Sequence, residues 1–350
     1  MSNIKIAFWN LQNLFDITLS EIAADFEFIP EEGWTQERLN QKIKNIASII
    51  KSLHNGNGPD LLGICEIEND QLTQRLIDEI GRDDYEIVHA PSPDIRGIDV
   101  ALIYSNNIFE QLGEAIPHLV HSRYPTRDIL QVKFKVKENN SEIFVFVNHW
   151  PSRKKGKYET EPLRIAVADY CGRLVDQCLK IQRKDYVNLS NDESSLKKIN
   201  DYWNKNVILM GDFNDEPFDR GIMNYLQASR DLDHLEEIFK KSGNNYKPEI
   251  KNYLGKKAYL FDCMWNLLGD SDIGTYYFGE SVNSMNMLDQ FIISRGLYFG
   301  EQKLRIDLNS TKIFTEIMST LLKKRPKEFD KSTGEGFSDH FPIEAIIKTL

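Results

Sequence analysis

Short apolar segments of strand length recur along the whole chain, and most of them stop or start at a polar residue. The segments, each with its polar neighbour, are 4–9 with Asn10, 61–65 with Glu66, 100–104 with Asp99, 143–147 with Asn148, 207–211 with Asp212, 291–293 with Asp289 and 341–347 with His340. Runs of this length, rich in Ile, Val and Phe, are typical of β-strands. Because they are apolar almost throughout, we expect both faces of their sheets to be covered.

Helical periodicity elsewhere in the chain can provide that cover. Between residues 37 and 53 the apolar side chains fall on one stripe, and segments 72–80 and 163–179 show a similar pattern. Strands and helices alternate irregularly, which argues against a doubly wound parallel sheet. We therefore predict an α/β (α+β) protein in which two packed sheets carry helices on their outer faces.

The domain organisation follows from length and from the absence of a boundary. The 350 residues suffice for two average domains or for one large one. No internal repeat or low-complexity tract divides the chain, so we predict a single domain over residues 1–350. Polar segments near residues 180–206 and 243–257 are interpreted as excursions from it, the second as a long loop.

The net charge of −10 limits the classes of partner. A protein that coats nucleic acid non-specifically usually has a basic excess, so the acidic balance argues against that mode of binding. It does not argue against carboxylates that hold a divalent cation, because a bound metal reverses the local field. Basic clusters at residues 153–157 and 323–327 are either solvated loops or contacts for a polyanion.

Cysteine usage and hydropathy bear on the compartment. The four cysteines, Cys65, Cys171, Cys178 and Cys263, form no CxxC pair and no cluster with zinc-ligand spacing. A reducing environment is the simpler inference. The first ten residues lack the pattern of a signal peptide, and no apolar stretch is long enough for a transmembrane helix. We therefore expect a cytoplasmic protein without a membrane span.

The polar residues at the strand ends form a set of oxygen donors: Asn10, Glu66, Asp212, Asn214 and Asp339. Taken singly, each could be a turn or cap residue. If the strand ends converge, the carboxylates repel one another unless a cation lies among them. Oxygen donors with no Cys and few His favour Mg²⁺, with Mn²⁺ as a possible substitute. Magnesium commonly binds carboxylates together with substrate phosphates, so this set indicates phosphoryl chemistry.

Two histidines stand beside the same strand ends. His149 follows one strand directly, and His340 follows Asp339 at the head of another. A single histidine is more often structural than catalytic. Here a further carboxylate, Asp289, lies in an apolar segment and could orient an imidazole. A carboxylate in that position fixes the tautomer and stabilises the imidazolium, as in an acid–base pair.

At this point the chain resembles a known group, the endonuclease/exonuclease/phosphatase (DNase I-like) superfamily. The motifs that carry the resemblance are residues 8–14, 65–69, 148–150, 211–217, 287–291 and 338–342, in the same order as in the superfamily. Details at residues 96–101, 126–130, 149–153 and 274–277 are similar to a bacterial subgroup. The resemblance implies a four-layer sandwich of two mixed, mostly antiparallel sheets with helices outside.

The resemblance also implies roles at the metal. Glu66, with Asn10 and with Asp339 through water, would hold one Mg²⁺ against a non-bridging phosphate oxygen. Asp212 would orient and deprotonate the attacking water, and Asn214 would help to hold it. The expected reaction is in-line hydrolysis of a phosphate ester.

Donors to the phosphate are implied in the same way. His340, oriented by Asp289, would donate to a phosphate oxygen, and His149 would be a second donor. Further phosphate contacts are predicted for Asn148, Arg153, Arg127 and Arg96; phosphate contact is favoured over a surface salt bridge for Arg153, and both alternatives stay open for Arg127 and Arg96.

Three functions remain open on the sequence. A nuclease acting on DNA or RNA is favoured, because the basic residues 153–157 lie next to His149 where a polyanion could pass. A phosphatase or phospholipase-type phosphodiesterase on a small or lipid headgroup substrate suits the acidic balance equally well. A non-catalytic binding module is disfavoured, because every motif residue is present. A nucleic acid substrate is expected, and no obligate protein partner is evident.

Overall fold

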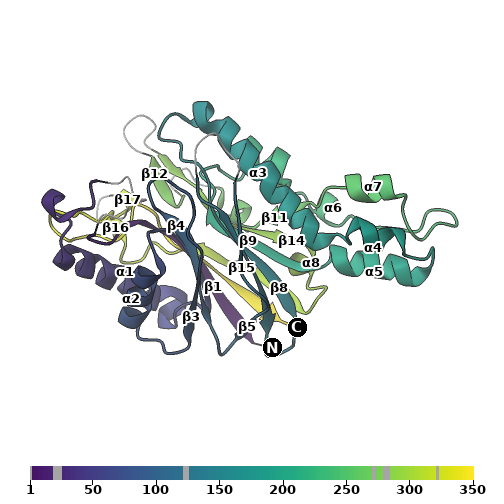
Figure 1. The fold of residues 1–350 in the computed structure, drawn as a ribbon, viewed down its shortest axis with the longest axis horizontal. Helices are drawn as coiled ribbons and strands as arrows, with labels where there is room; N and C mark the ends of the chain where they lie inside the picture. Colours follow the sequence, from purple (N-terminus) through teal and green to yellow (C-terminus); the bar gives the residue numbers. More distant parts are fainter. Residues whose placement is uncertain (1, 19–25, 121–125, 270–272, 279–283, 321–322) are drawn as a thin grey trace.

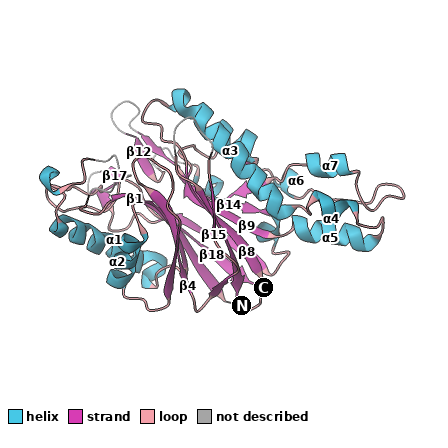
Figure 2. Ribbon diagram, viewed as in Figure 1, coloured by secondary structure: helices cyan, strands magenta, loops and turns pink. Residues whose placement is uncertain are grey.

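The computed structural model describes the chain except residues 1, 19–25, 121–125, 270–272, 279–283 and 321–322. Figures 1 and 2 show two β-sheets packed face to face, with helices against their outer faces. The predicted sandwich of two sheets between outer helices is therefore confirmed, and the pairings within both sheets are mostly antiparallel.

The first sheet contains six strands in the order β15-β18-β1-β2-β4-β3. Their bounds are β1 Asn3–Leu14, β2 Leu61–Ile67, β3 Tyr85–His89, β4 Asp99–Ser105, β15 Leu304–Ile313 and β18 Ile343–Thr349. Only β1 and β2 run parallel, and the other neighbours are antiparallel. The apolar segments of the sequence thus form the centre of this sheet.

The second sheet has the order β10-β11-β14-β9-β8-β7-β5, with β6 paired to β7. Its strands are β5 Phe109–Gln111, β6 Ile116–His118, β7 Ile129–Val136, β8 Glu142–His149, β9 Asn206–Asp212, β10 Ala228–Ser229, β11 Leu260–Asp262 and β14 Asp289–Ser294. Two small hairpins lie outside the sheets: β12 Tyr276–Phe278 with β13 Ser284–Asn286, and β16 Ser319–Thr320 with β17 Lys323–Pro326.

The longer helices form the outer layers, and some of the helices begin and end at recognisable caps. Their bounds are η1 Pro30–Glu32, α1 Gln36–Gly56, α2 Asp70–Ile80, α3 Lys157–Leu179, α4 Arg183–Val187, α5 Glu193–Trp203, η2 Gly221–Leu226, α6 Leu232–Leu235, α7 Ile250–Gly255, η3 Cys263–Leu267 and α8 Arg295–Phe299. Thr35 and Asn69 accept backbone N–H groups at the starts of α1 and α2, and Gly81 ends α2 in a left-handed conformation. Such caps satisfy the free amides of a first turn and let the chain leave the helix.

Three apolar layers hold these elements together. The central layer lies between the sheets and includes Phe8, Val145 and Phe291. The stripe of α1 packs with α2 on the outer face of the six-stranded sheet. Trp150 belongs to the third layer, where α3 and α5 pack on the outer face of the eight-stranded sheet. Burial on both faces explains why the central strands are apolar almost throughout.

The two polar segments are more helical than the sequence analysis expected. Residues 180–206 contain α4 and α5, and the predicted loop at 243–257 contains α7. Figure 1 shows these helices side by side at one end of the molecule. The rings of Tyr186 in α4 and Tyr253 in α7 stack at 4.0 Å, and Trp203 of α5 packs at 5.1 Å against Phe239, which precedes the second segment.

Two other expectations concern cysteine and membrane residence. All four cysteines are buried and unbridged, as expected for structural thiols. Among the residues that the structure describes, no helix combines the length and the apolarity that crossing a membrane requires.

Candidate active site

The strand ends that carry the predicted residues meet at one edge of the two sheets. Asn10 of β1 lies beside Cys65 of β2, and Asp212 of β9 lies between His149 of β8 and Asp289 of β14. With the segment before β18 they enclose a cleft of about 520 Å³. The predicted residues that line it are Glu66, Arg96, Arg127, His149, Arg153, Asp212, Asn214, Asp339 and His340.

Several residues at or beside this cleft have a left-handed backbone conformation. Gln12, Asn13, Glu66 and Asn214 have φ angles of 53°, 59°, 61° and 49°. The left-handed conformation costs a residue with a Cβ about 1–2 kcal/mol. The strand pairing also shifts register after Asn10 on β1 and across Glu66 on β2, so both strands bulge there. A bulge redirects a side chain, and here it turns polar groups into the cleft.

Glu66 is held by the bulge of β1. Its Oε2 accepts the backbone N–H of Asn13 at 2.9 Å. The amide nitrogen of Asn10 lies 3.4 Å from Glu66 Oε1 and donates to Asp212 Oδ2 at 3.1 Å. The amide oxygen of Asn10 accepts the N–H of Gln12 at 3.0 Å. In this rotamer Asn10 therefore steers the two carboxylates, and its amide must turn over to present oxygen to a cation.

Asp212 ends β9 in a confined position. The strand can approach β8 this closely only because Gly211 has no side chain, since a Cβ there would lie 2.3 Å from the carbonyl oxygen of Asn148. Asp212 Oδ1 accepts the N–H of Asn214 at 2.9 Å. Burial raises the pKa of Asp212 to about 7, and the charges of Asp289 and Glu66 add to the rise. A carboxyl that titrates near neutrality suits a general base.

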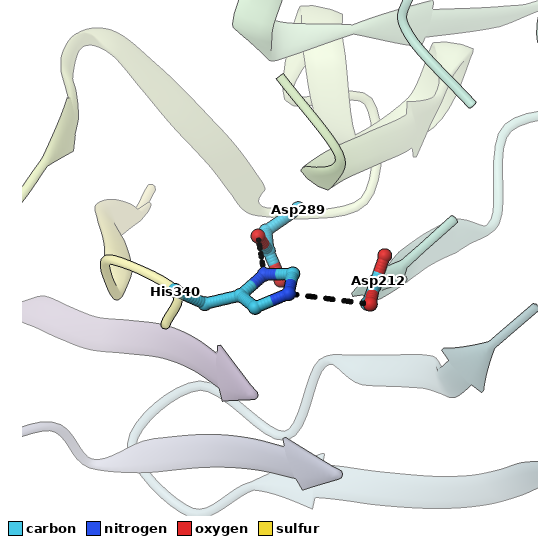
Figure 3. A group of neighbouring side chains, drawn as sticks. All are labelled: Asp212, Asp289 and His340. Atoms are coloured by element: carbon cyan, nitrogen blue, oxygen red, sulfur yellow. Dashed lines mark hydrogen bonds and ion pairs between the residues drawn. The ribbon is translucent and has the colours of Figure 1, made fainter. Parts of the chain in front are cut away.

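His340 lies between two carboxylates (Figure 3). Its Nδ1 is 2.7 Å from Asp289 Oδ2, and its Nε2 is 3.8 Å from Asp212 Oδ2. Burial alone would lower the pKa of His340, but Asp289 and Asp212 outweigh it and raise the pKa to about 10. Thr275 fixes the start of β14, because its hydroxyl accepts the N–H of Asp289. The imidazole is therefore held as a cation that can donate through Nε2.

His149 has the opposite charge state. Its Nε2 is 3.7 Å from Glu66 Oε1 and 3.8 Å from Asp212 Oδ2. Burial lowers the pKa of His149 well below its ordinary value, and the nearby guanidinium groups of Arg127 and Arg96 lower it further. The neutral ring can donate one hydrogen bond at the cleft.

The carboxylates at the cleft fit a divalent cation. Burial raises the pKa of Asp339 to about 6, and the charge of Glu66 adds to the rise. Asp339 Oδ1 is buried and has no hydrogen-bond partner. An unpaired buried oxygen facing other carboxylates is costly unless a cation compensates. Ligand atoms of Asp212, Asp289 and His340 also lie within 4.8 Å of one another. Because His340 Nδ1 is engaged by Asp289, we interpret that trio as a hydrogen-bonded Asp289–His340 pair with Asp212 as its second ion-pair partner.

Asn148 and Arg153, two of the predicted phosphate contacts, form hydrogen bonds within the protein. Asn148 faces away from the cleft, and its amide oxygen accepts the indole N–H of Trp150 at 3.2 Å. Arg153 borders the cleft but is buried, and each of its three nitrogens donates to a protein oxygen, on Asn214, Asn286 and Asp219. Both residues hold the loops of the site in this structure.

The other two arginines face the cleft. Arg127 donates to Asp94 at 3.1 Å and to the carbonyl of Trp150 at 2.8 Å, while its Nε is buried without a partner. Arg96 donates to Asn13 Oδ1 at 2.6 Å. Both side chains line the cleft, and their charges add to the effect of burial in lowering the pKa of His149.

Two residues near the site escaped the sequence analysis. Lys42 of α1 is 2% exposed and lies on the apolar stripe of that helix, where a lysine is unusual. Burial lowers its pKa to about 7, against the raising effect of Asp339 and Glu66. Tyr276 lines the cleft with its ring 4.7 Å from that of His340. The position of Lys42 on the stripe was a signal that the sequence offered.

Comparisons with known proteins identify the family. The sequence matches the model of the Endonuclease/Exonuclease/phosphatase family over residues 5–268. No curated protein matches the chain in sequence.

Solved structures share the fold at low sequence identity. A family protein from Bacteroides thetaiotaomicron has a TM-score of 0.55 at 15% identity, covering 100% of this chain and 96% of that one. A mannosyl-6-phosphatase of the same organism has a TM-score of 0.53 at 15% identity, with 98% and 99% covered. TDP2 of D. rerio, complexed with a single-strand DNA product, has a TM-score of 0.54 at 13% identity, with 100% of each chain covered. With a family match over most of its length, the chain belongs to the endonuclease/exonuclease/phosphatase family.

Proposed function

We propose that the protein is a metal-dependent phosphoesterase that hydrolyses phosphodiester bonds of nucleic acid. The observation that carries the hydrolytic part is the pairing at the cleft of a buried carboxyl and a buried imidazole, both with a raised pKa. Burial raises the pKa of Asp212 to about 7, and the charges of Asp289 and Asp212 outweigh burial and raise the pKa of His340, 3.8 Å from Asp212, to about 10. Around neutral pH this pair offers a carboxylate base beside an imidazolium donor, which is the combination that water attack on a phosphate ester requires.

Glu66 and Asp339 are the proposed ligands of a divalent cation, with Asn10 joining them once its amide is turned over. These donors are all oxygens, which favours Mg²⁺ and allows Mn²⁺. When bound, the cation would neutralise charge on the phosphate and on the leaving oxygen. The backbone N–H of Asn13 keeps Glu66 turned into the cleft.

The remaining steps belong to the side chains of the chain. Asp212 accepts the proton of the attacking water, and the N–H of Asn214 keeps the carboxylate oriented. His340 donates from Nε2 to a phosphate oxygen, while Asp289 holds the ring at Nδ1. His149 is the second donor to the phosphate, and its ring is neutral because burial lowers its pKa. Donors held in a confined site need little rearrangement as charge develops, which is why they lower the barrier.

Nucleic acid is the proposed substrate because of the charges around the cleft. Arg96 and Arg127 line it, together with the exposed Lys154 and Lys155, in a chain whose net charge is −10. A local basic border is what a polyanion recognises. The structure of D. rerio TDP2 with a single-strand DNA product is consistent with this choice.

A phosphatase acting on a small phosphoester is the second candidate. A mannosyl-6-phosphatase shares the fold about as closely as the DNA-bound protein does. A cleft of about 520 Å³ is also large enough for a sugar phosphate. The two candidates differ in substrate and share the proposed catalytic groups.

A substrate panel separates the candidates. The purified protein is incubated with supercoiled, abasic and single-stranded DNA, RNA, phosphomonoesters and bis-(p-nitrophenyl) phosphate, each with Mg²⁺, with Mn²⁺ and with EDTA. We expect cleavage of nucleic acid and of the diester with either metal and none with EDTA. Hydrolysis of phosphomonoesters alone would select the phosphatase. No hydrolysis in any metal arm would reject the phosphoesterase.

The pH profile of kcat/KM is expected to be bell-shaped. Asp212 acts as a base, so activity rises as pH passes its pKa of about 7. His340 acts as a donor, so activity falls as pH passes its pKa of about 10. A bound cation moves both limbs to lower pH. In Asp289→Asn the falling limb should shift down by about 1–3 pH units, because the carboxylate beside the imidazole is removed.

The control for this profile is Asp307→Asn. Asp307 pairs with Lys348 at 2.6 Å on β15, outside the cleft, so its removal should leave both limbs in place. An unchanged falling limb in Asp289→Asn would show that His340 is not the donor.

A further inference from the structure

Lys42 reaches from α1 to the bulge of β1 beside the cleft. Its Nζ donates to the carbonyl oxygen of Gln12 and, at 3.3 Å, to that of Asn13. The same nitrogen lies 5.8 Å from the centre of the Trp34 ring and 5.2 Å from that of Phe329. Aromatic faces favour a cationic nitrogen, so the pocket is adapted to this side chain.

The backbone N–H groups of Gln12 and Asn13, the two residues that Lys42 contacts, point away from Lys42 and toward the cleft. The N–H of Gln12 donates to Asn10 Oδ1 at 3.0 Å, and the N–H of Asn13 donates to Glu66 Oε2 at 2.9 Å. Gln12 and Asn13 are both left-handed. Two consecutive strained residues thus have their carbonyls on the lysine and their amides on the groups of the cleft.

Packing alone does not account for a lysine at this position. The neighbouring buried positions of the α1 stripe, among them Leu39, Ile43 and Ile46, are aliphatic. Burying an amine costs free energy that an aliphatic residue avoids. Lys42 offsets this cost because it donates to the carbonyls of Gln12 and Asn13. Its side chain has enough N–H groups for both hydrogen bonds, whether it is protonated or neutral.

We propose that Lys42 is a positioning residue that holds the Gln12–Asn13 bulge and, through the backbone amide of Asn13, orients Glu66 toward a divalent cation. The inference rests on the proposed function, because it concerns the same metal site. Residues that orient metal ligands typically change metal affinity or activity by about 10- to 100-fold when removed. Loss of Lys42 should therefore weaken metal binding, and the reaction at saturating metal should change less.

The test measures metal binding directly. Lys42→Met keeps the length of the side chain and removes its donors, and Mn²⁺ binding is followed by electron paramagnetic resonance without substrate. We expect the Kd for Mn²⁺ to rise about 10-fold or more. At saturating metal, KM for bis-(p-nitrophenyl) phosphate should change little. The Tm should stay close to that of the wild type, because the gain from removing a buried amine is offset by the loss of the donor to the two carbonyls.

Lys44→Met is the matched control, because Lys44 is exposed on the same helix and should bind Mn²⁺ as the wild type does. An unchanged Mn²⁺ Kd in Lys42→Met would overturn the positioning role. If Lys42→Met does not fold, the same measurements are made on Lys42→Gln. Failure of both to fold would make Lys42 a residue of the fold and also reject the proposal. A wild type that neither binds Mn²⁺ nor hydrolyses phosphoesters would instead reject the proposed function.

Discussion

Asp212→Asn is expected to lower kcat on a phosphodiester by about 10²- to 10⁴-fold, the range that a general base contributes. The amide has the shape of the carboxylate and can keep the hydrogen bond from the Asn214 N–H. It cannot accept the proton of the attacking water. The loss should therefore appear in kcat at every pH between the limbs of the wild-type profile.

Stability should move in the other direction. The pKa of Asp212 is raised to about 7 in the folded protein, so the fold disfavours its charged form. Above the ordinary pKa of a carboxyl this lowers the free energy of unfolding, and Asn removes the charge. We expect the Tm of Asp212→Asn to equal or exceed that of the wild type, measured by calorimetry at pH 8.

A matched control comes from a second buried carboxylate. Asp262 is fully buried outside the cleft, and burial raises its pKa to about 7 as well. Asp262→Asn makes the same chemical change at a similar depth and should retain wild-type kcat. Near-normal kcat in Asp212→Asn would contradict the proposed base. Equal losses in both variants would assign the effect to the fold.

Much of the fold could be predicted because burial on both faces leaves a clear trace. The strands around Ile64 and Ile208 are apolar at nearly every position, and the stripe of α1 marks its covered face. Helices α4, α5 and α7 were harder to predict. Their buried residues, such as Tyr186 and Tyr253, pack on one another, and the intervening residues are polar. Only the tertiary arrangement shows that these polar segments bury a face.

The site was predictable to the level of which strand ends meet. Strand alternation sends adjacent side chains to opposite faces, so His149 at the cleft implies that Asn148 faces away from it. This alternation along the strand can be read from the sequence alone. The burial of Arg153 cannot, because its partners Asn286 and Asp219 come from distant segments. The rotamer of Asn10 likewise depends on the bulge that follows it.

The second large effect is expected at Glu66. Glu66→Ala should abolish metal-dependent hydrolysis, a greater loss than the roughly 10- to 100-fold typical of a residue that only orients a ligand. The Mn²⁺ Kd should rise in parallel, which electron paramagnetic resonance can measure without substrate. Wild-type activity on bis-(p-nitrophenyl) phosphate in this variant would contradict the proposed metal site.

Glu66→Gly adds information that the alanine variant lacks. Glycine within a strand is usually about 0.5–1 kcal/mol less favourable than alanine. At the φ of 61° found for Glu66 the preference reverses, because alanine pays the left-handed cost of about 1–2 kcal/mol and glycine does not. Both variants should be inactive, and Glu66→Gly should have the larger free energy of unfolding by about 1 kcal/mol.

Ala101→Gly in the neighbouring strand β4 calibrates that comparison. Ala101 pairs with Ile64 in the same sheet and is not among the left-handed residues, so its replacement by glycine should destabilise. If glycine is more stabilising than alanine at position 66 and less stabilising than alanine at position 101, the backbone at residue 66 is strained. A glutamate that costs backbone energy and is needed for metal binding is held there by its function. If glycine lowers the free energy of unfolding relative to alanine at both positions, the left-handed residue 66 carries no strain, and strain gives no support to a functional bulge.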